Sequence, residues 1–295
     1  MQKLVKPVKL TSQVIKGNGQ GLLIGFPTAN LKLSKTFPKI KKGVYFSVIE
    51  IHNQSFLGLT YYGPKHINNQ ATNVCEVHIF NFDKNIYSQT LKLKLTHFIR
   101  PPKKPVNLQA VKKLIQQDIR ALDNYIVLVS KQDQPIGIEK ILKIHQNPPQ
   151  LHQAISVLIY NSKKQLLLQK RSKYKPLWSL YWSNTCCSNV RPGLSIKNFA
   201  KKRLNEEMGL TTKLKFKYKL PYKAKYNHRL SEYEIDHVFF GFTDDKPIPN
   251  PKEAADFKYI SIDNLKKDIK TNPSKYTPWF KLILKRLETS DILSS

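Results

Sequence analysis

The sequence predicts two domains, an antiparallel β-barrel followed by an α/β sandwich. The chain has 295 residues, 40% of them apolar, which is enough for two cores of ordinary size. Up to about residue 122, short apolar runs follow one another with turns between them and no helical pattern, as in a barrel. After that point strand and helix patterns are mixed. We therefore expect domains over 1–122 and 123–295.

Four strands and one helix are expected in the first half. The strand patterns cover residues 43–51, 56–62, 75–80 and 90–98, and in the last of these leucines alternate with lysines. Asn107 can cap the helix, whose apolar residues form one stripe: Leu108, Val111, Leu114, Ile115, Ile119 and Leu122.

The second half is expected to open with a strand over 125–129 and a turn over 131–137. Strands 154–160 and 165–170 are predicted to form a hairpin. Ser195 can cap the next helix, and Gly209 can end it. A strand over 234–242 and an amphipathic helix after Pro278 complete the mixed pattern of an α/β sandwich.

The net charge of +30 invites a nucleic-acid interpretation, which the residue types do not favour. The basic residues are mostly lysines spread along the whole chain, whereas base and phosphate readers favour arginine. No apolar run is long enough to span a membrane, and the first residues lack the apolar block of a signal peptide. Three cysteines without paired spacing indicate a reducing compartment, so we expect a cytoplasmic protein.

A glycine-rich stretch, residues 16–30 (KGNGQGLLIGFPTAN), precedes the barrel strands. Glycines let backbone N–H groups approach a phosphate closely, but alone they equally indicate a flexible turn. With GVY at 43–45 and EVH at 76–78, the stretch resembles riboflavin kinase over roughly residues 10–122. The resemblance implies a Greek-key barrel that transfers the γ-phosphate of ATP to riboflavin, giving FMN.

Site residues follow from this resemblance. Thr28 and Asn30 would hold Mg²⁺ and the ATP phosphates, with Gly17 and Gly21 in the phosphate loop. Glu76 would be the base that takes the proton from the riboflavin hydroxyl, and Arg100 would contact substrate.

Two adjacent cysteines, Cys186 and Cys187, follow an aromatic run in the second half. Side chains alternate along an extended segment, so only one of the two can face a given cavity. Taken alone, both could be small core residues. Several further segments, however, resemble type I isopentenyl diphosphate isomerase in order: LHQA (151–154), QKR (169–171), WSNTCC (182–187), EEMG (206–209), SEYE (231–234) and TPWF (277–280).

This resemblance implies a Nudix-like sandwich in which a thiol and a glutamate move protons. Cys187 and Glu234 match those positions, and Tyr222 matches a tyrosine that assists the carboxyl group. Trp279 matches an aromatic position that can stabilise a cation. Arg171 and Lys175 match diphosphate contacts.

The same resemblance implies a metal site. His145, His152, Glu232 and Glu234 match four of its ligands, and Asn189 stands where a third histidine is expected. An amide oxygen is a harder and weaker ligand than imidazole, so affinity for Zn²⁺ should fall and Mg²⁺ or Mn²⁺ become the more favoured ions. Alternatively, the site has lost its metal and with it the isomerase activity. Glu207 would bind a second ion, Mg²⁺, against the substrate diphosphate.

The sequence thus predicts a bifunctional cytoplasmic enzyme acting on isopentenyl diphosphate, riboflavin and ATP. It would use Mg²⁺ and a second divalent metal (Zn²⁺, Mn²⁺ or Mg²⁺), without membrane, specific nucleic acid or obligate protein partner. In one alternative, only one activity is retained and the barrel is a flavin-binding or docking module. In another, the Nudix-like domain hydrolyses a different diphosphate.

Overall fold

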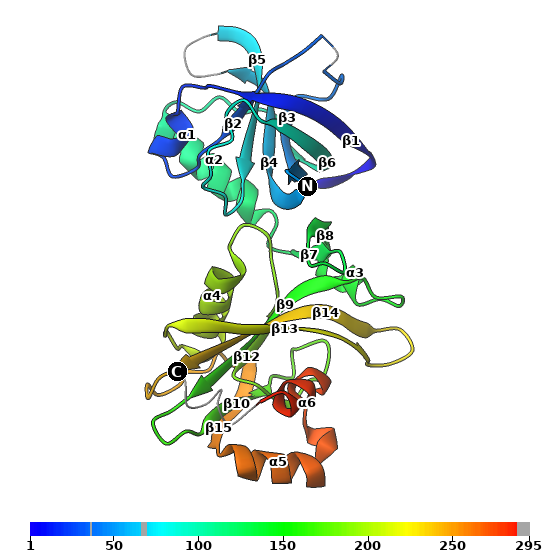
Figure 1. The fold of residues 1–295 in the computed structure, drawn as a ribbon, viewed down its shortest axis with the longest axis vertical. Coiled ribbons are helices and arrows are strands. Elements are labelled where there is room, and N and C mark those ends of the chain that lie inside the picture. The colour runs from blue at the N-terminus through cyan, green and yellow to red at the C-terminus, as the bar shows by residue number, and fades with distance from the viewer. Residues whose placement is uncertain (36, 66–69, 288–295) are drawn as a thin grey trace. The chain divides into compact units, whose positions relative to one another are not determined.

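The computed structural model describes residues 1–35, 37–65 and 70–287, which divide into two compact units. The first unit holds Met1–Lys140 with the short segment Arg191–Leu194, and the second holds Ile141–Val190 and the chain from Ser195 on. Figure 1 colours both along the sequence. Within the described ranges, no helix has the length and apolar character needed to cross a bilayer.

A closed barrel forms most of the first unit, as predicted, and each strand runs antiparallel to its neighbours. The order around the barrel is β1 (Gln2–Ile15), β2 (Ala29–Leu31), β5 (Gln70–Ile79), β4 (Gln54–Lys65), β3 (Gly43–Ile51) and β6 (Thr90–Arg100). The four predicted strands are confirmed as β3 to β6. Strand β1 went unpredicted because, of its residues, only Leu10 and Val14 are buried, so it has little apolar pattern.

Helix α2 (Leu108–Arg120) begins where predicted, because the Asn107 side chain accepts a hydrogen bond from the Ala110 N–H at 2.9 Å. A four-residue helix, α1 (Gln20–Leu23), interrupts the glycine-rich stretch. After α2, strands β7 (Tyr125–Val129) and β8 (Pro135–Lys140) form an antiparallel hairpin. The turn expected over 131–137 is therefore wrong in its last three residues, since a hydrogen bond from Ser130 N to Gln134 O closes a shorter turn.

The β7–β8 hairpin lies beyond the predicted domain boundary at residue 122 and contacts the barrel. Ser55 Oγ donates to the Pro135 carbonyl at 2.5 Å, and Lys3 Nζ lies 2.9 Å from Glu139 Oε2. The boundary itself stays a prediction.

The second unit is the predicted α/β sandwich. Its central strand β9 (His152–Tyr160) runs parallel to β14 (Ser231–Phe242) and antiparallel to β12 (Cys186–Asn189). Strand β13 (Leu214–Lys225) pairs with β14, while β10 (Leu166–Arg171) pairs with β11 (Trp182–Ser183) and β15 (Ala254–Ile260). Figure 1 shows α4 (Ile196–Met208) on one side of the sheet and α5 (Ile262–Thr271) and α6 (Pro278–Lys285) on the other. Short α3 (Ile141–Ile144) and a 3₁₀ turn, Pro273–Lys275, complete the unit.

The predicted hairpin of residues 154–160 and 165–170 is confirmed at its turn, where β9 and β10 run antiparallel, but its ladder is short. Asn161 N donates to Gln165 O, but the two strands share only the pair Leu166 and Tyr160. The reason is that β9 is buried along its whole length and pairs with β14 and β12. Its position at the centre of the sheet follows from long-range pairing, which short-range alternation does not encode.

Candidate active sites

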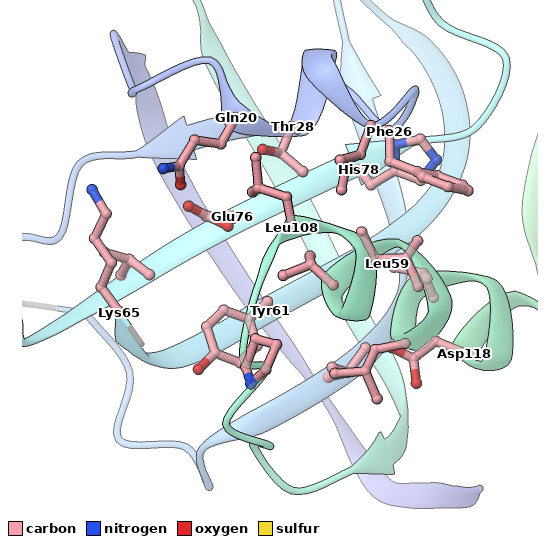
Figure 2. Close-up of a pocket in the computed structure, with 18 of the residues that line it drawn as sticks. Gln20, Phe26, Thr28, Leu59, Tyr61, Lys65, Glu76, His78, Leu108 and Asp118 are labelled. Atoms are coloured by element: carbon pink, nitrogen blue, oxygen red, sulfur yellow. The ribbon is translucent and has the colours of Figure 1, made fainter. Parts of the chain in front are cut away.

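A pocket opens in the barrel unit beside the glycine-rich stretch (Figure 2). Gln20, Thr28 and Glu76 lie together at one end. Much of the remaining wall is apolar and comes from Ile24 after α1, from the barrel strands and from the stripe of α2: Ile24, Val44, Leu59, Leu108, Val111, Leu114 and Ile115. A pocket with one polar end and an apolar wall suits a ligand that joins a phosphate group to a flat ring.

Glu76 lies in the middle of β5, opposite Asn30 on β2 and Tyr61 on β4. Directly paired residues on neighbouring strands share a face of the sheet, and all three line the pocket. The sheet register therefore brings the predicted base beside one of the predicted Mg²⁺ ligands.

At two of its glycines the glycine-rich stretch passes so close to its neighbours that it leaves no room for a side chain. A Cβ on Gly17 would lie 2.0 Å from Asn30 Nδ2, and one on Gly21 would lie 2.4 Å from the Phe26 carbonyl oxygen. Gly21 lines the pocket, as expected of a phosphate loop. Gly17 is instead packed against the Asn30 amide, and its role in a phosphate loop stays a prediction.

Lys65, at the end of β4, is a pocket residue that the sequence motifs missed. Burial raises the pKa of the Glu76 carboxyl above its ordinary value, while the positive charge of Lys65 acts in the opposite direction. Figure 2 shows the two side chains on the same side of the pocket. Lys65 belongs to no motif, so only the strand register reveals its place.

Arg100, predicted to contact substrate, lines the pocket but is engaged within the protein. Its Nε lies 2.7 Å from Asp118 Oδ1, and its Nη2 lies 2.8 Å from Asp118 Oδ2. This bidentate pair fastens α2 to the end of β6. A direct contact of Arg100 with substrate stays a prediction.

In the second unit, the four predicted metal ligands His145, His152, Glu232 and Glu234 converge. One ligand atom from each lies within 4.8 Å of all the others, and all four residues are buried. His152 Nε2 lies 3.3 Å from Glu234 Oε1, and His145 Nε2 lies 2.9 Å from Glu232 Oε2. The parallel pairing of β9 with β14 places His152 directly beside Glu234.

Both imidazoles are oriented as metal ligands. Nδ1 of His145 contacts the Ile141 carbonyl at 3.1 Å, and Nδ1 of His152 contacts the Gln150 carbonyl at 2.8 Å. A carbonyl accepts a hydrogen bond, so each Nδ1 carries a proton. In the neutral ring Nε2 then has the lone pair that a metal ion would bind, whereas in the protonated ring Nε2 donates toward the glutamates.

The cluster also contains a polar atom without a partner. Glu232 Oε2 is buried and has no hydrogen bond of good geometry with any described residue, despite the nearby His145. A buried carboxylate oxygen left unpaired costs free energy that a bound cation would recover. Asn189 borders the cluster, with Nδ2 3.1 Å from His145 Nε2. Two imidazoles, two carboxylates and an amide fit a divalent metal ion.

The adjacent cysteines separate as predicted. Cys186 is fully buried, while Cys187 is partly exposed and packs beside the aromatic core. Burial raises the pKa of the Cys187 thiol to about 11, although nearby Arg171 acts in the opposite direction. Arg171 Nη1 lies 3.3 Å from Cys187 Sγ. The thiol therefore carries its proton at neutral pH.

Trp279 contacts Arg171, the neighbour of Cys187, and lies near Tyr222, the neighbour of Glu234. The Arg171 guanidinium lies 5.2 Å from the Trp279 ring centre, and the Tyr222 ring lies 6.4 Å from it. The Tyr222 hydroxyl in turn donates a hydrogen bond to Glu234 Oε2. Burial acts to raise the pKa of Glu234, but the hydrogen bond and charge of His152 outweigh it and hold that pKa below its ordinary value. A protonated thiol and a carboxylate are thus linked to the Trp279 ring, the thiol through Arg171 and the carboxylate through Tyr222.

Glu207 is fully buried at the end of α4, and both of its oxygens are engaged. Oε1 lies 2.7 Å from Arg203 Nη2 and 3.7 Å from Lys175 Nζ, and Oε2 accepts from Gln169 Nε2 at 3.1 Å. Glu253, which no motif identified, contacts the same two cations. The predicted roles of Glu207 with Mg²⁺ and of Arg171 and Lys175 with diphosphate stay predictions.

Comparison with known proteins agrees with the family expected for each half of the chain. Residues 4–126 match the family model described as riboflavin kinase, and residues 150–280 match the NUDIX domain. Isopentenyl-diphosphate Delta-isomerase 1 of Aromatoleum aromaticum is 39% identical over 166 residues, covering 56% of this chain and 93% of that protein. The isopentenyl-diphosphate Delta-isomerase of Pectobacterium atrosepticum is 41% identical, covering 55% of this chain and 90% of its own.

The fold and the two sites define a two-domain enzyme, a riboflavin kinase domain joined to a Nudix domain. Through the Nudix domain the chain belongs to the isopentenyl-diphosphate Delta-isomerase family. The assignment of each half to its family is confirmed.

Proposed function

We propose that the second unit converts isopentenyl diphosphate into dimethylallyl diphosphate and that the barrel phosphorylates riboflavin with ATP. The isomerase assignment rests on the contacts that link Cys187 to Trp279 through Arg171 and Glu234 to Trp279 through Tyr222. Glu234 also belongs to the His/Glu cluster, which consists of His145, His152, Glu232 and Glu234. The kinase assignment is supported by Glu76, which faces the polar end of the barrel pocket beside Asn30.

Isomerisation requires that one carbon gain a proton and a neighbouring carbon lose one. The Cys187 thiol is poised to donate, and the Glu234 carboxylate, assisted by Tyr222, is poised to accept. The Trp279 ring, only 4% exposed, can stabilise the cationic state between the two transfers and exclude water. A divalent cation bound by the His/Glu cluster would supply positive charge that holds Glu232 and Glu234 in place.

The purified full-length protein, incubated with Mg²⁺ and isopentenyl diphosphate, is expected to yield dimethylallyl diphosphate. Mass spectrometry or NMR would identify the product. Release of inorganic phosphate or pyrophosphate without isomerised product would instead support the Nudix-like hydrolysis of a diphosphate.

Asn189 is expected to set the metal preference of the cluster. Its amide is a harder and weaker ligand than imidazole, so the wild type should bind Mg²⁺ or Mn²⁺ in preference to Zn²⁺. The substitution Asn189→His should reverse this preference. We expect Asn189→His to raise Zn²⁺ affinity about 10-fold or more, measured by calorimetry and by metal content after dialysis.

Ser188→Ala is the matched control on the same strand, since Ser188 neighbours Asn189 and its side chain points to the opposite face of β12. Equal Zn²⁺ affinity in wild type and Asn189→His would show that the amide lies outside the ligand set.

A further inference from the structure

Four charged side chains form a closed ring at the end of α4. Lys175 contacts Glu253, Glu253 contacts Arg203 at 2.8 Å, Arg203 contacts Glu207 at 2.7 Å, and Glu207 lies 3.7 Å from Lys175. Positive and negative charges alternate, so within the ring each cation has two carboxylate partners, and Arg203 also contacts Glu206 outside it. Glu207 and Arg203 are the buried members, at 0% and 7% exposed, whereas Lys175 and Glu253 reach solvent at 15% and 22%.

The backbone around Glu253 is hydrogen-bonded to the segments that carry the other three residues of the ring. Ser172 N donates to the Glu253 carbonyl at 3.0 Å, and Ser172 Oγ donates to the Lys252 carbonyl at 2.7 Å. On the other side, Asn250 N donates to the Glu207 carbonyl at 2.9 Å. The turn before β15 is thus tied both to the Lys175 segment and to the end of α4, and the Glu253 side chain has a defined direction.

Lys175 depends on Glu253 for its position. Its other carboxylate partner, Glu207, already accepts hydrogen bonds from Arg203 and Gln169 and lies farther away. A lysine side chain has a long, flexible stem, and holding its ammonium in one place costs conformational entropy unless a close partner offsets it. The same region includes Arg171, so three cations lie near two carboxylates, Glu207 and Glu253. This excess of positive charge is suited to an incoming diphosphate.

We infer that Glu253 is a positioning residue for the isomerase reaction, holding Lys175 and Arg203 where they receive the substrate diphosphate. This inference rests on the proposed isomerase function. A positioned cation strengthens binding in the ground state and in the transition state alike, so its loss raises KM and leaves kcat nearly unchanged.

The experiment compares Glu253→Gln with Glu206→Gln in the full-length protein. Gln keeps the shape of Glu253 and removes its charge, and we expect KM for isopentenyl diphosphate to rise roughly fivefold at constant kcat. Glu206 is the matched control because it also contacts Arg203, at 2.7 Å, but does not contact Lys175 in the described structure. Its variant should keep the wild-type KM.

Calorimetric binding of inorganic pyrophosphate with Mg²⁺ provides a readout that does not require turnover. Weaker pyrophosphate binding by Glu253→Gln than by the wild type supports the inference. It does so even if the wild type fails to isomerise isopentenyl diphosphate, a result that would contradict only the proposed function. A lower KM in Glu253→Gln would mean that its charge repels the substrate, and a lower Tm with unchanged KM would mean a purely structural role. Either result overturns the inference.

Discussion

Replacing Cys187 with Ala is expected to abolish isomerisation, with kcat falling by about 10³-fold or more, because the site loses one of its two proton-transfer groups. The thiol is the group that carries a proton at neutral pH, since burial raises its pKa to about 11. The loss should appear in kcat, measured by product formation at saturating isopentenyl diphosphate, because alanine leaves the diphosphate contacts in place.

Cys186→Ala is the matched control for this prediction. The two cysteines are adjacent on β12, but Cys186 is fully buried and points away from the site. Its replacement leaves a small cavity and should lower Tm slightly with little change in kcat. Comparable turnover in Cys187→Ala and wild type would show that the thiol is not an acid or base in the reaction.

The two adjacent cysteines show how much of this site can be predicted from the alternation of side chains along a strand. Alternation along an extended segment predicts that they face opposite ways, and β12 confirms it. The choice of Cys187 as the reactive thiol came from the family resemblance, and the contact with Arg171 now supports it. Asn189 lies two residues farther along the same strand, so it reaches the same side of the sheet and borders the His/Glu cluster.

Other parts of the fold could not be predicted from local pattern. The alternation of leucine and lysine in β6 was clear because one face of that strand is buried. In contrast, β9 is buried along its whole length, so its sequence does not show that it pairs in parallel with β14. That parallel pairing is what places His152 beside Glu234.

Residues that act through charge, without belonging to a motif, were also missed. Lys65 and Glu253 both lie among the site groups, but each reaches its site through pairing or backbone contacts between segments distant in sequence. In a chain with 50 basic residues, nothing local distinguishes Lys65 from a solvated lysine. Such residues become visible only when the register of the strands is known.

Replacing Glu76 with Gln is expected to reduce ATP-dependent FMN formation by about 10²-fold or more, because the amide cannot accept the proton of the riboflavin hydroxyl. Glutamine has nearly the same shape and can keep its place between Asn30 and Tyr61, so riboflavin binding should survive. Burial raises the pKa of Glu76, so wild-type kinase activity should also fall as pH is lowered through that raised pKa, where the base becomes protonated. Chromatography of FMN measures the first effect, and the pH profile of kcat measures the second.

Glu50→Gln is the control, since Glu50 lies on the barrel strand β3, is 43% exposed and pairs with Lys92 at 2.7 Å. It should retain wild-type FMN formation and an unchanged pH profile. Titration of riboflavin fluorescence against the wild type and Glu76→Gln separates binding from phosphorylation. Tight riboflavin binding without FMN formation in the wild type would identify the barrel as a flavin-binding module. Full activity in Glu76→Gln would show that phosphoryl transfer in this pocket is governed by positioning of ATP and Mg²⁺ at Thr28 and Asn30, without a carboxylate base.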